Sequence, residues 1–328
     1  MDGKRKVFSG VQPSGNMHIG NYLGAFRNWV KLQDEYEAIY CVVDLHALTA
    51  PVDPVELHTN RIEAAKMLLA VGIDPDRSLL YLQSQVPQHA ELSWILGTMT
   101  PSGVLNRMTQ FKEKSEAGGA SLGLYAYPVL MAADILLHRA DLVPVGDDQR
   151  QHLEMTRDLA ERFNNRFGEV FPIPEALIPE TSARVMSLTD PTEKMSKSDS
   201  NVKSRILMTD TPDAIRGKIK AARTDSEPTV RYAWGEKPGI SNLLEMMAGS
   251  TDSSIDDLVA EYADSGYGVF KEAVAEAVIE LVAPIRTAYT RLENEEVARL
   301  MRKGALDART SAEGYQREVR RAVGLDSV

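Results

Sequence analysis

The sequence predicts an α/β protein in which a doubly wound parallel sheet of the Rossmann type is followed by a C-terminal all-helical domain. Three observations predict it. In the first half of the chain, short apolar runs of strand character alternate with longer segments of helical periodicity. A stretch that contains Pro172, Pro174 and Pro179 interrupts this alternation, and beyond residue 210 only helical periodicity remains. A length of 328 residues is sufficient for two such domains.

The predicted elements follow one another in a regular order. Strands are expected at 7–11, 38–43, 78–83 and 142–145. Between them we expect a helix with Tyr22, Leu23, Phe26, Trp29 and Val30 on one face, a helix at 55–71 and a helix at 147–163. Asp53 before Pro54 is typical of a helix start, and Gly72 of a helix end. In the second half, helices are expected from Pro212, at 255–263, at 269–301 with a kink at Pro284, and at 308–323.

Composition and charge restrict where the protein acts and what it binds. The longest apolar run, near 64–73, is interrupted by Lys66, so no segment is expected to span a membrane. The basic N-terminus has no apolar stretch behind it and the lone Cys41 cannot form a disulfide framework, so we expect a cytoplasmic protein. A net charge of −10 is unusual for a nucleic-acid binder, although local basic patches can contact phosphates. The candidate patches are Arg216, Lys218, Lys220 and Arg223, and Arg299, Arg302, Lys303, Arg317, Arg320 and Arg321, with solvated helix faces as the alternative interpretation.

A glycine-containing loop at residues 10–21 joins the first strand to the first helix. Free backbone N–H groups at a helix start attract anions, and Gly15 and Gly20 let the chain approach a nucleotide closely. His18 adds an N–H donor that can reach phosphate oxygens without a permanent charge. By itself the pattern is weak, because glycines after a strand are usually turn residues.

A second segment, here named the lysine loop, runs Glu193-Lys194-Met195-Ser196-Lys197-Ser198. Two lysines three residues apart in a mobile loop can fold over a triphosphate and neutralise it. A polar connector between domains is the alternative interpretation. Taken together, however, the two segments resemble the paired motifs of class I aminoacyl-tRNA synthetases. Residues 194–198 match the second motif, and residues 18–21 match the first except that Asn21 replaces the usual second histidine, for which an amide donor can substitute.

Further blocks, at 8–15, 107–114, 127–134, 143–149, 157–160 and 238–244, resemble the bacterial tryptophanyl-tRNA synthetases in particular. The resemblance implies ATP, L-tryptophan and tRNA(Trp) as partners, a homodimer, and Mg²⁺ held mainly by the phosphates. It implies a catalytic domain at 1–190, a lysine loop and linker at 191–204, and a helical anticodon-binding domain at 205–328 whose last helix packs back on the catalytic domain. The implied catalytic residues are His18, Asn21, Lys114, Lys194 and Lys197. The implied ATP-binding residues are Gln12, Ser14, Gly20, Asn21, Gly146, Asp148, Lys194, Met195, Ser196, Lys197 and Ser198.

Asp134 bears on the choice between the tryptophan and tyrosine enzymes of this family. It lies in the apolar stretch 131–137, so a helix there would bury its carboxylate, which then needs a donor. An indole offers one N–H and no acceptor. The resemblance implies that tyrosine enzymes carry a glutamine three residues earlier, to share the phenol hydroxyl. Met131 occupies that position here and cannot bond a phenol well, so tryptophan is predicted.

The residues that the resemblance assigns to the tryptophan pocket are Phe8, Gly10, Tyr127, Met131, Asp134, Val143, Val145 and Gln149, with Tyr127 and Gln149 at the α-amino group. Three alternatives stay open. Asp134 could pair only within the core, the chain could be a tyrosyl-tRNA synthetase, or it could be a non-catalytic paralogue that binds tryptophan or RNA. Intact His18, Lys194 and Lys197 argue against the last alternative.

Overall fold

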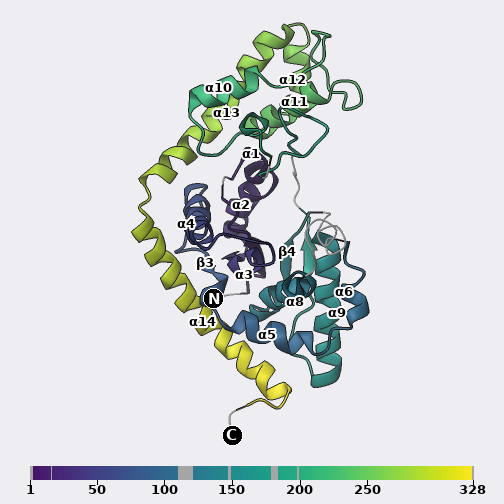
Figure 1. Ribbon diagram of the computed structural model, residues 1–328, viewed down its shortest axis with the longest axis vertical. Coiled ribbons are helices and arrows are strands. Elements are labelled where there is room, and N and C mark those ends of the chain that lie inside the picture. The colour runs from purple at the N-terminus through teal and green to yellow at the C-terminus, as the bar shows by residue number, and fades with distance from the viewer. Residues whose placement is uncertain are drawn as a thin grey trace.

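A five-stranded parallel sheet lies at the centre of the computed structural model, which describes residues 3–15, 17–109, 121–146, 149–178, 184–197 and 199–326 (Figure 1). The strands are β1 Lys6–Val11, β2 Glu37–Val42, β3 Leu79–Leu82, β4 Leu142–Pro144 and β5 Glu175–Leu177, in the order β3-β2-β1-β4-β5. All four pairings are parallel. The predicted α/β fold is confirmed, with β5 as a short, partly exposed strand that the sequence did not predict.

The strand order reverses at β1. Strands β2 and β3 lie on one side of β1, and strands β4 and β5 lie on the other. In an open parallel sheet, such a reversal leaves a crevice at the carboxyl ends of the two strands that flank it. Here those strands are β1 and β4, which pair through Val7 and Leu142. The topology therefore places a ligand crevice after Val11 and Pro144.

Helices of the first half cover both faces of the sheet. They are α1 Ile19–Asn21, a π-helical turn Tyr22–Phe26, α2 Arg27–Glu35, α3 Asp44–Ala47, α4 Pro54–Ala70, α5 Gln88–Gly97, α6 Ser102–Leu105, α8 Leu122–Leu137 and α9 Arg150–Phe167. Asp53 caps α4 by accepting hydrogen bonds from the backbone N–H groups of Val55 and Glu56. Gly72, with φ of 111°, follows the end of α4, as its position predicted.

The second half is helical, as predicted, but its last two helices divide at a different place. The helices are α10 Pro212–Lys220, α11 Pro238–Thr251, α12 Ile255–Tyr262, α13 Gly266–Arg291 and α14 Asn294–Ala322. The predicted helices at 269–301 and 308–323 are wrong, because the break lies at Leu292, whose backbone is extended with ψ of 123°. Glu295 and Glu296 stand in the first turn of α14, where carboxylates favour a helix start. Pro284 lies inside α13 and does not end it.

Helix α14 turns back along the α/β part of the molecule (Figure 1). It contacts β3, α4 and α5. At Gly304 the backbones approach so closely that an added Cβ would lie 1.9 Å from the carbonyl oxygen of Leu80. Glycine is therefore required where α14 crosses the sheet edge.

Two apolar clusters lie on opposite faces of the sheet. Val7 of β1 belongs to the cluster that continues into the helical part, through Ile215 and Phe270. Its neighbour Phe8 belongs to the second cluster, which α5, α8, α9 and α14 cover. Successive strand residues thus face opposite clusters, as the period of two requires. The core of the helical part is continuous with one face of the sheet.

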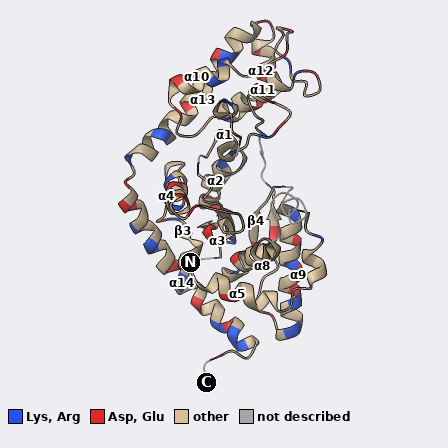
Figure 2. Cartoon of the chain, in the orientation of Figure 1, with Lys and Arg blue, Asp and Glu red and all other residues tan. Residues whose placement is uncertain are grey.

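Charges of both signs alternate along α10, α13 and α14 (Figure 2). Several cations of the candidate patches form ion pairs: Arg216 with Glu276, Lys218 with Asp210, Lys303 with Asp76 and Arg320 with Glu91. These four cations are therefore paired with carboxylates of the protein. Within the described part of the chain, no helix combines the length and the apolar character needed to cross a membrane.

Candidate active site

The loop after β1 and the first helical turn form one wall of the site. The backbone N–H of His18 donates to Oδ1 of Asn21 at 3.1 Å, and the backbone N–H of Asn21 donates to the His18 carbonyl at 2.8 Å. These reciprocal bonds close the start of the helix. The His18 side chain is buried over Gly20, where an added Cβ would lie 3.0 Å from the imidazole Nδ1. Glycine at position 20 thus makes room for the imidazole.

The first three residues of the lysine loop, 193–195, pair with residues 185–187 in a short antiparallel stem. The N–H of Ser187 donates to the Glu193 carbonyl at 2.8 Å, and the N–H of Met195 donates to the Val185 carbonyl at 3.2 Å. Beyond the stem, Nζ of Lys197 donates to the Ser14 hydroxyl at 2.7 Å. The two sequence motifs, which are far apart along the chain, therefore meet in space.

Burial shifts the pKa values of the ionisable groups where the two motifs meet. Burial, together with the charges of Lys197, Arg205 and Lys194, lowers the pKa of His18 to about 4. The imidazole is therefore a neutral N–H donor at neutral pH. Burial also lowers the pKa of Lys197 to about 8, because the ammonium has lost part of its hydration. Both groups therefore favour the binding of an anion, which would replace the hydration that they lost on burial.

A cavity of about 890 Å³ opens at the carboxyl ends of β1 and β4. All eight residues that the sequence assigned to tryptophan line it: Phe8, Gly10, Tyr127, Met131, Asp134, Val143, Val145 and Gln149. Gln12, one of the assigned ATP residues, lines it as well. The cavity therefore joins an apolar part near Met131 and Val143 to the loop that leads to Ser14 and Lys197.

The fold and this pair of motifs can be compared with known proteins. A family model described as tRNA synthetases class I (W and Y) matches residues 2–283. The chain belongs to this family of class I tRNA synthetases. It is 52% identical over 322 residues to the tryptophan–tRNA ligase of Caldanaerobacter subterraneus subsp. tengcongensis, with 98% of each chain covered. It is also similar to the solved tryptophanyl-tRNA synthetase of Mycoplasma pneumoniae, with a TM-score of 0.88, 33% identity and 99% of each chain covered. The Campylobacter jejuni tryptophanyl-tRNA synthetase complexed with ADP and tryptophan gives a TM-score of 0.85 at 35% identity, covering 98% of this chain and 100% of that one.

In this synthetase Asp134 lies on α8 and is fully buried. It lines the cavity and also contacts polar side chains of the protein interior. Nε2 of His46 lies 2.8 Å from its Oδ2, Nε2 of Gln83 donates to Oδ1 at 2.7 Å, and Nδ1 of His89 lies 2.7 Å from Oδ1. Burial alone raises the pKa of Asp134, but the hydrogen bonds from the two histidines outweigh it and hold the pKa at about 2. The carboxylate is therefore ionised and can only accept. A ligand beside it must donate.

A chain of buried polar groups continues behind Asp134. Nε2 of His89, on the ring edge away from the carboxylate, lies 2.9 Å from the Tyr81 hydroxyl. The Tyr81 hydroxyl in turn lies 2.7 Å from Nε2 of His138. Burial lowers the pKa of His138 to about 3 and raises that of Tyr81, so both stay neutral. Buried polar contacts thus continue from Asp134 through His89 and Tyr81 to His138.

Tyr127 and Gln149 lie at another part of the cavity wall. The Tyr127 hydroxyl is 2.8 Å from Nε2 of the buried His152, and its ring meets that of His46 at an interplanar angle of 79°. Burial raises the pKa of Tyr127 to about 12, so the hydroxyl keeps its proton. Gln149 immediately precedes α9. Both residues line the cavity.

The remaining predicted residues divide into three groups. Lys114, Asp148 and Ser198 lie outside the described residues. Gly146 and Ser196 are exposed near the site, as is Lys194 at the stem. The side chain of Met195, however, is 3% exposed and packs in the apolar core, so only its backbone is available to a nucleotide. Met195 therefore anchors the loop.

Sequence reasoning missed several polar residues of the site, above all His46, Gln83, His89 and His152. Two of them carried a usable signal, because Gln83 follows directly after the buried strand β3 and His46 lies in the short helix α3, which begins just after β2. Polar residues at the carboxyl ends of parallel strands gather at the ligand crevice. His89 and His152 lie within helices and had no such signal.

Proposed function

We propose that the chain is a tryptophan–tRNA ligase, which activates L-tryptophan with ATP and transfers it to tRNA(Trp). The observation that carries the proposal is the ionised, acceptor-only Asp134 beside the apolar Met131 and Val143 in the cavity. An indole has one N–H to donate and an apolar surface to bury, so it matches both features. The high identity to a relative named tryptophan–tRNA ligase supports the same substrate.

Tyrosine fits the cavity less well. Its phenol hydroxyl both donates and accepts, and Asp134 can satisfy only the donated proton. The thioether of Met131, which lines the same cavity, is a poor donor and acceptor. A pocket that offers no partner to an added hydroxyl of the ligand discriminates against that ligand by roughly 10²-fold. Tryptophan is therefore favoured by what the pocket lacks as well as by what it offers.

In the first step, the tryptophan carboxylate attacks the α-phosphorus of ATP and pyrophosphate departs. The nucleophile is already ionised, so no general base is needed, and catalysis consists of positioning and charge neutralisation. Neutral His18 would donate to the phosphates, while Lys194, Lys197 and Lys114 would stabilise the leaving pyrophosphate. Tyr127 and Gln149 would hold the α-amino group.

Mg²⁺ would accompany ATP and be held mainly by phosphate oxygens. Among the described residues, no group of three or more His, Cys, Asp or Glu side chains is arranged to hold a metal ion. The side chains that meet at the phosphate side, Ser14, His18 and Lys197, are likewise not a set of carboxylate ligands. Bound in this way, Mg²⁺ would neutralise part of the phosphate charge.

In the second step, a hydroxyl of the terminal adenosine of tRNA attacks the carbonyl of the adenylate, and AMP leaves. We assign residues 1–190 to ATP and tryptophan, 191–204 to the lysine loop and linker, and 205–328 to the helical domain, with the anticodon read by 205–285. We further propose a homodimer that acts in the cytoplasm. Footprinting that placed 205–285 away from the anticodon would refute the anticodon assignment.

The test of the proposal is amino-acid-dependent ATP–pyrophosphate exchange, with tryptophan and tyrosine measured side by side. Exchange with tryptophan alone is the expected result. Exchange with tyrosine alone would overturn the pocket argument and leave the adenylation chemistry in place. Absence of exchange with either amino acid would favour a non-catalytic binding protein.

A further inference from the structure

One side chain of the helical part holds the stem of the lysine loop. Asn242, on α11, is 1% exposed. Its Oδ1 accepts from the backbone N–H of Met186 at 2.7 Å, and its Nδ2 donates to the backbone carbonyl of the same residue at 2.9 Å. A single amide group therefore satisfies both polar backbone groups of Met186.

The pairing within the stem explains why Met186 needs this partner. Met186 stands opposite Lys194 in an antiparallel bridge, and the hydrogen bonds of the stem flank the pair rather than join it. In a non-hydrogen-bonded pair, the backbone N–H and C=O groups point away from the partner strand. Without Asn242 these groups of Met186 would be buried and unsatisfied, which is costly. Asn242 thus takes the place of a third strand beside the stem.

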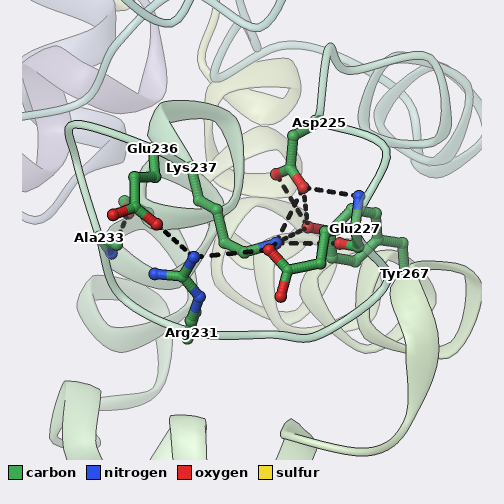
Figure 3. A network of polar contacts seen from close by, with 8 residues as sticks. Asp225, Glu227, Arg231, Ala233, Glu236, Lys237 and Tyr267 are labelled. Carbon is green, nitrogen blue, oxygen red and sulfur yellow. Dashed lines mark hydrogen bonds and ion pairs between the residues drawn. The ribbon is translucent and has the colours of Figure 1, made fainter.

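The helix that carries Asn242 is itself firmly held. Lys237, just before α11, is 1% exposed, and its Nζ donates to Asp225 at 2.8 Å, to the Glu227 carbonyl at 2.9 Å and to the Tyr267 hydroxyl at 2.8 Å (Figure 3). These contacts join the segment before α11 to α13. Gly239, near the start of α11, lies against the backbone of Arg223. A Cβ added at this glycine would lie 2.1 Å from the Arg223 carbonyl oxygen, so the two backbones are in close contact.

We propose that Asn242 is a positioning residue for the lysine loop, which it holds through Met186 so that Lys194 and Lys197 face the phosphates of ATP. The inference rests on the proposed function, because it concerns the same adenylation site. Asn242 acts without touching a substrate. It makes the use of ATP depend on the placement of α11, an element of the part of the chain that we assign to tRNA.

The test compares Asn242→Ala with Ser241→Ala. Ser241 is the adjacent residue and is equally buried. Its hydroxyl accepts from the backbone N–H of Ala233 at 2.9 Å, so this hydrogen bond holds the segment before α11 and not the stem. Both substitutions remove a buried hydrogen-bonding side chain. In tryptophan-dependent exchange, we expect Asn242→Ala to lower kcat/KM for ATP about tenfold, with the KM for tryptophan unchanged. Ser241→Ala should stay within about twofold of wild type.

A second measurement does not depend on activity. Trypsin cleavage after Lys194 and Lys197 reports local opening of the loop, and we expect Asn242→Ala to raise its rate about tenfold at a urea concentration where neither variant unfolds. Equal behaviour of the two variants in both measurements, or a rise in the KM for tryptophan, would overturn the inference. If Asn242→Ala does not fold, Asn242→Ser keeps a neutral polar group that is too short to bond both the N–H and the carbonyl of Met186, and it should show the same pattern with a smaller effect.

The two proposals fail separately. A wild-type chain without exchange activity, but with trypsin cleavage that rises only in Asn242→Ala, would leave the Asn242–Met186 contact as the holder of the loop and remove the proposed function. An active wild type, together with equal cleavage in both variants, would support the proposed function and remove the positioning role of Asn242.

Discussion

The amino-acid side and the phosphate side of the site are built on opposite principles. At Asp134, interior partners fix the recognising group before any ligand arrives, through His46, Gln83 and His89. At Lys197, the partner among the described residues is the hydroxyl of Ser14, and burial has lowered the pKa of the ammonium. The first arrangement favours selectivity, because a fixed acceptor rejects ligands that cannot donate. The second favours catalysis, because a poorly solvated cation gains most from charge that develops on the phosphates.

The largest expected effect comes from breaking the amino-acid side. Asp134→Asn removes the charge that His46 and His89 surround and adds a donor toward the indole N–H. We expect kcat/KM for tryptophan to fall about 10³-fold, while the KM for ATP changes little. Asp44→Asn is the matched control, since Asp44 is a buried carboxylate that bonds Ser84 and does not line the cavity. Comparable losses in the two variants would mean that Asp134 has only a structural role.

Breaking the phosphate side should slow the chemistry and leave recognition intact. Lys197→Ala removes one of the cations assigned to the leaving pyrophosphate, so we expect adenylate formation to slow on the order of 10²-fold with tryptophan binding unchanged. Pre-steady-state rates and tryptophan titration measure the two quantities. Lys203→Ala, an exposed lysine after the loop, serves as the control. An equal loss in rate and in tryptophan binding would exclude the leaving-group role.

The pKa of Lys197 predicts a pH dependence for the phosphate side alone. In the free protein this lysine is charged below about pH 8 and loses its charge as the pH rises through that value. We expect kcat/KM for ATP to fall up to about tenfold per pH unit above it. The alkaline fall should be absent in Lys197→Arg, because a guanidinium stays charged. A wild-type profile that is level to pH 10 would contradict the assignment.

The last prediction concerns stability behind the amino-acid side. Burial lowers the pKa of His138 to about 3 from its ordinary 6.5. The unfolded chain therefore takes up a proton near pH 6.5 that the folded chain refuses until about pH 3, so stability is lost as the pH falls across this window. In urea unfolding between pH 4 and 6.5, His138→Asn should show a slope smaller by about one proton. An unchanged slope would mean that His138 does not titrate as described.

How much the sequence predicted also differs between the two sides. Strand and helix patterns sufficed for the parallel sheet and for the burial of Asp134, because both follow from local apolar periodicity. The lysine loop was identified by its motif. The partners His89 and His152 could not be predicted, since each lies within a helix and meets the site only through packing. The break at Leu292 was missed because the helical periodicity continues across it.

By itself, the sequence determined that a carboxylate would be buried next to Met131 and that two lysines would stand in a loop, since composition and spacing are properties of the chain. Only the tertiary structure decided what those groups contact. His89, Tyr81 and His138 come from three separate elements and form a chain only when β3, α5 and α8 pack together. Likewise, Lys197 reaches Ser14, and Asn242 reaches Met186, across distances along the chain that no local pattern spans. Hydrogen bonds act over about 3 Å, and the fold alone sets which groups come within that range.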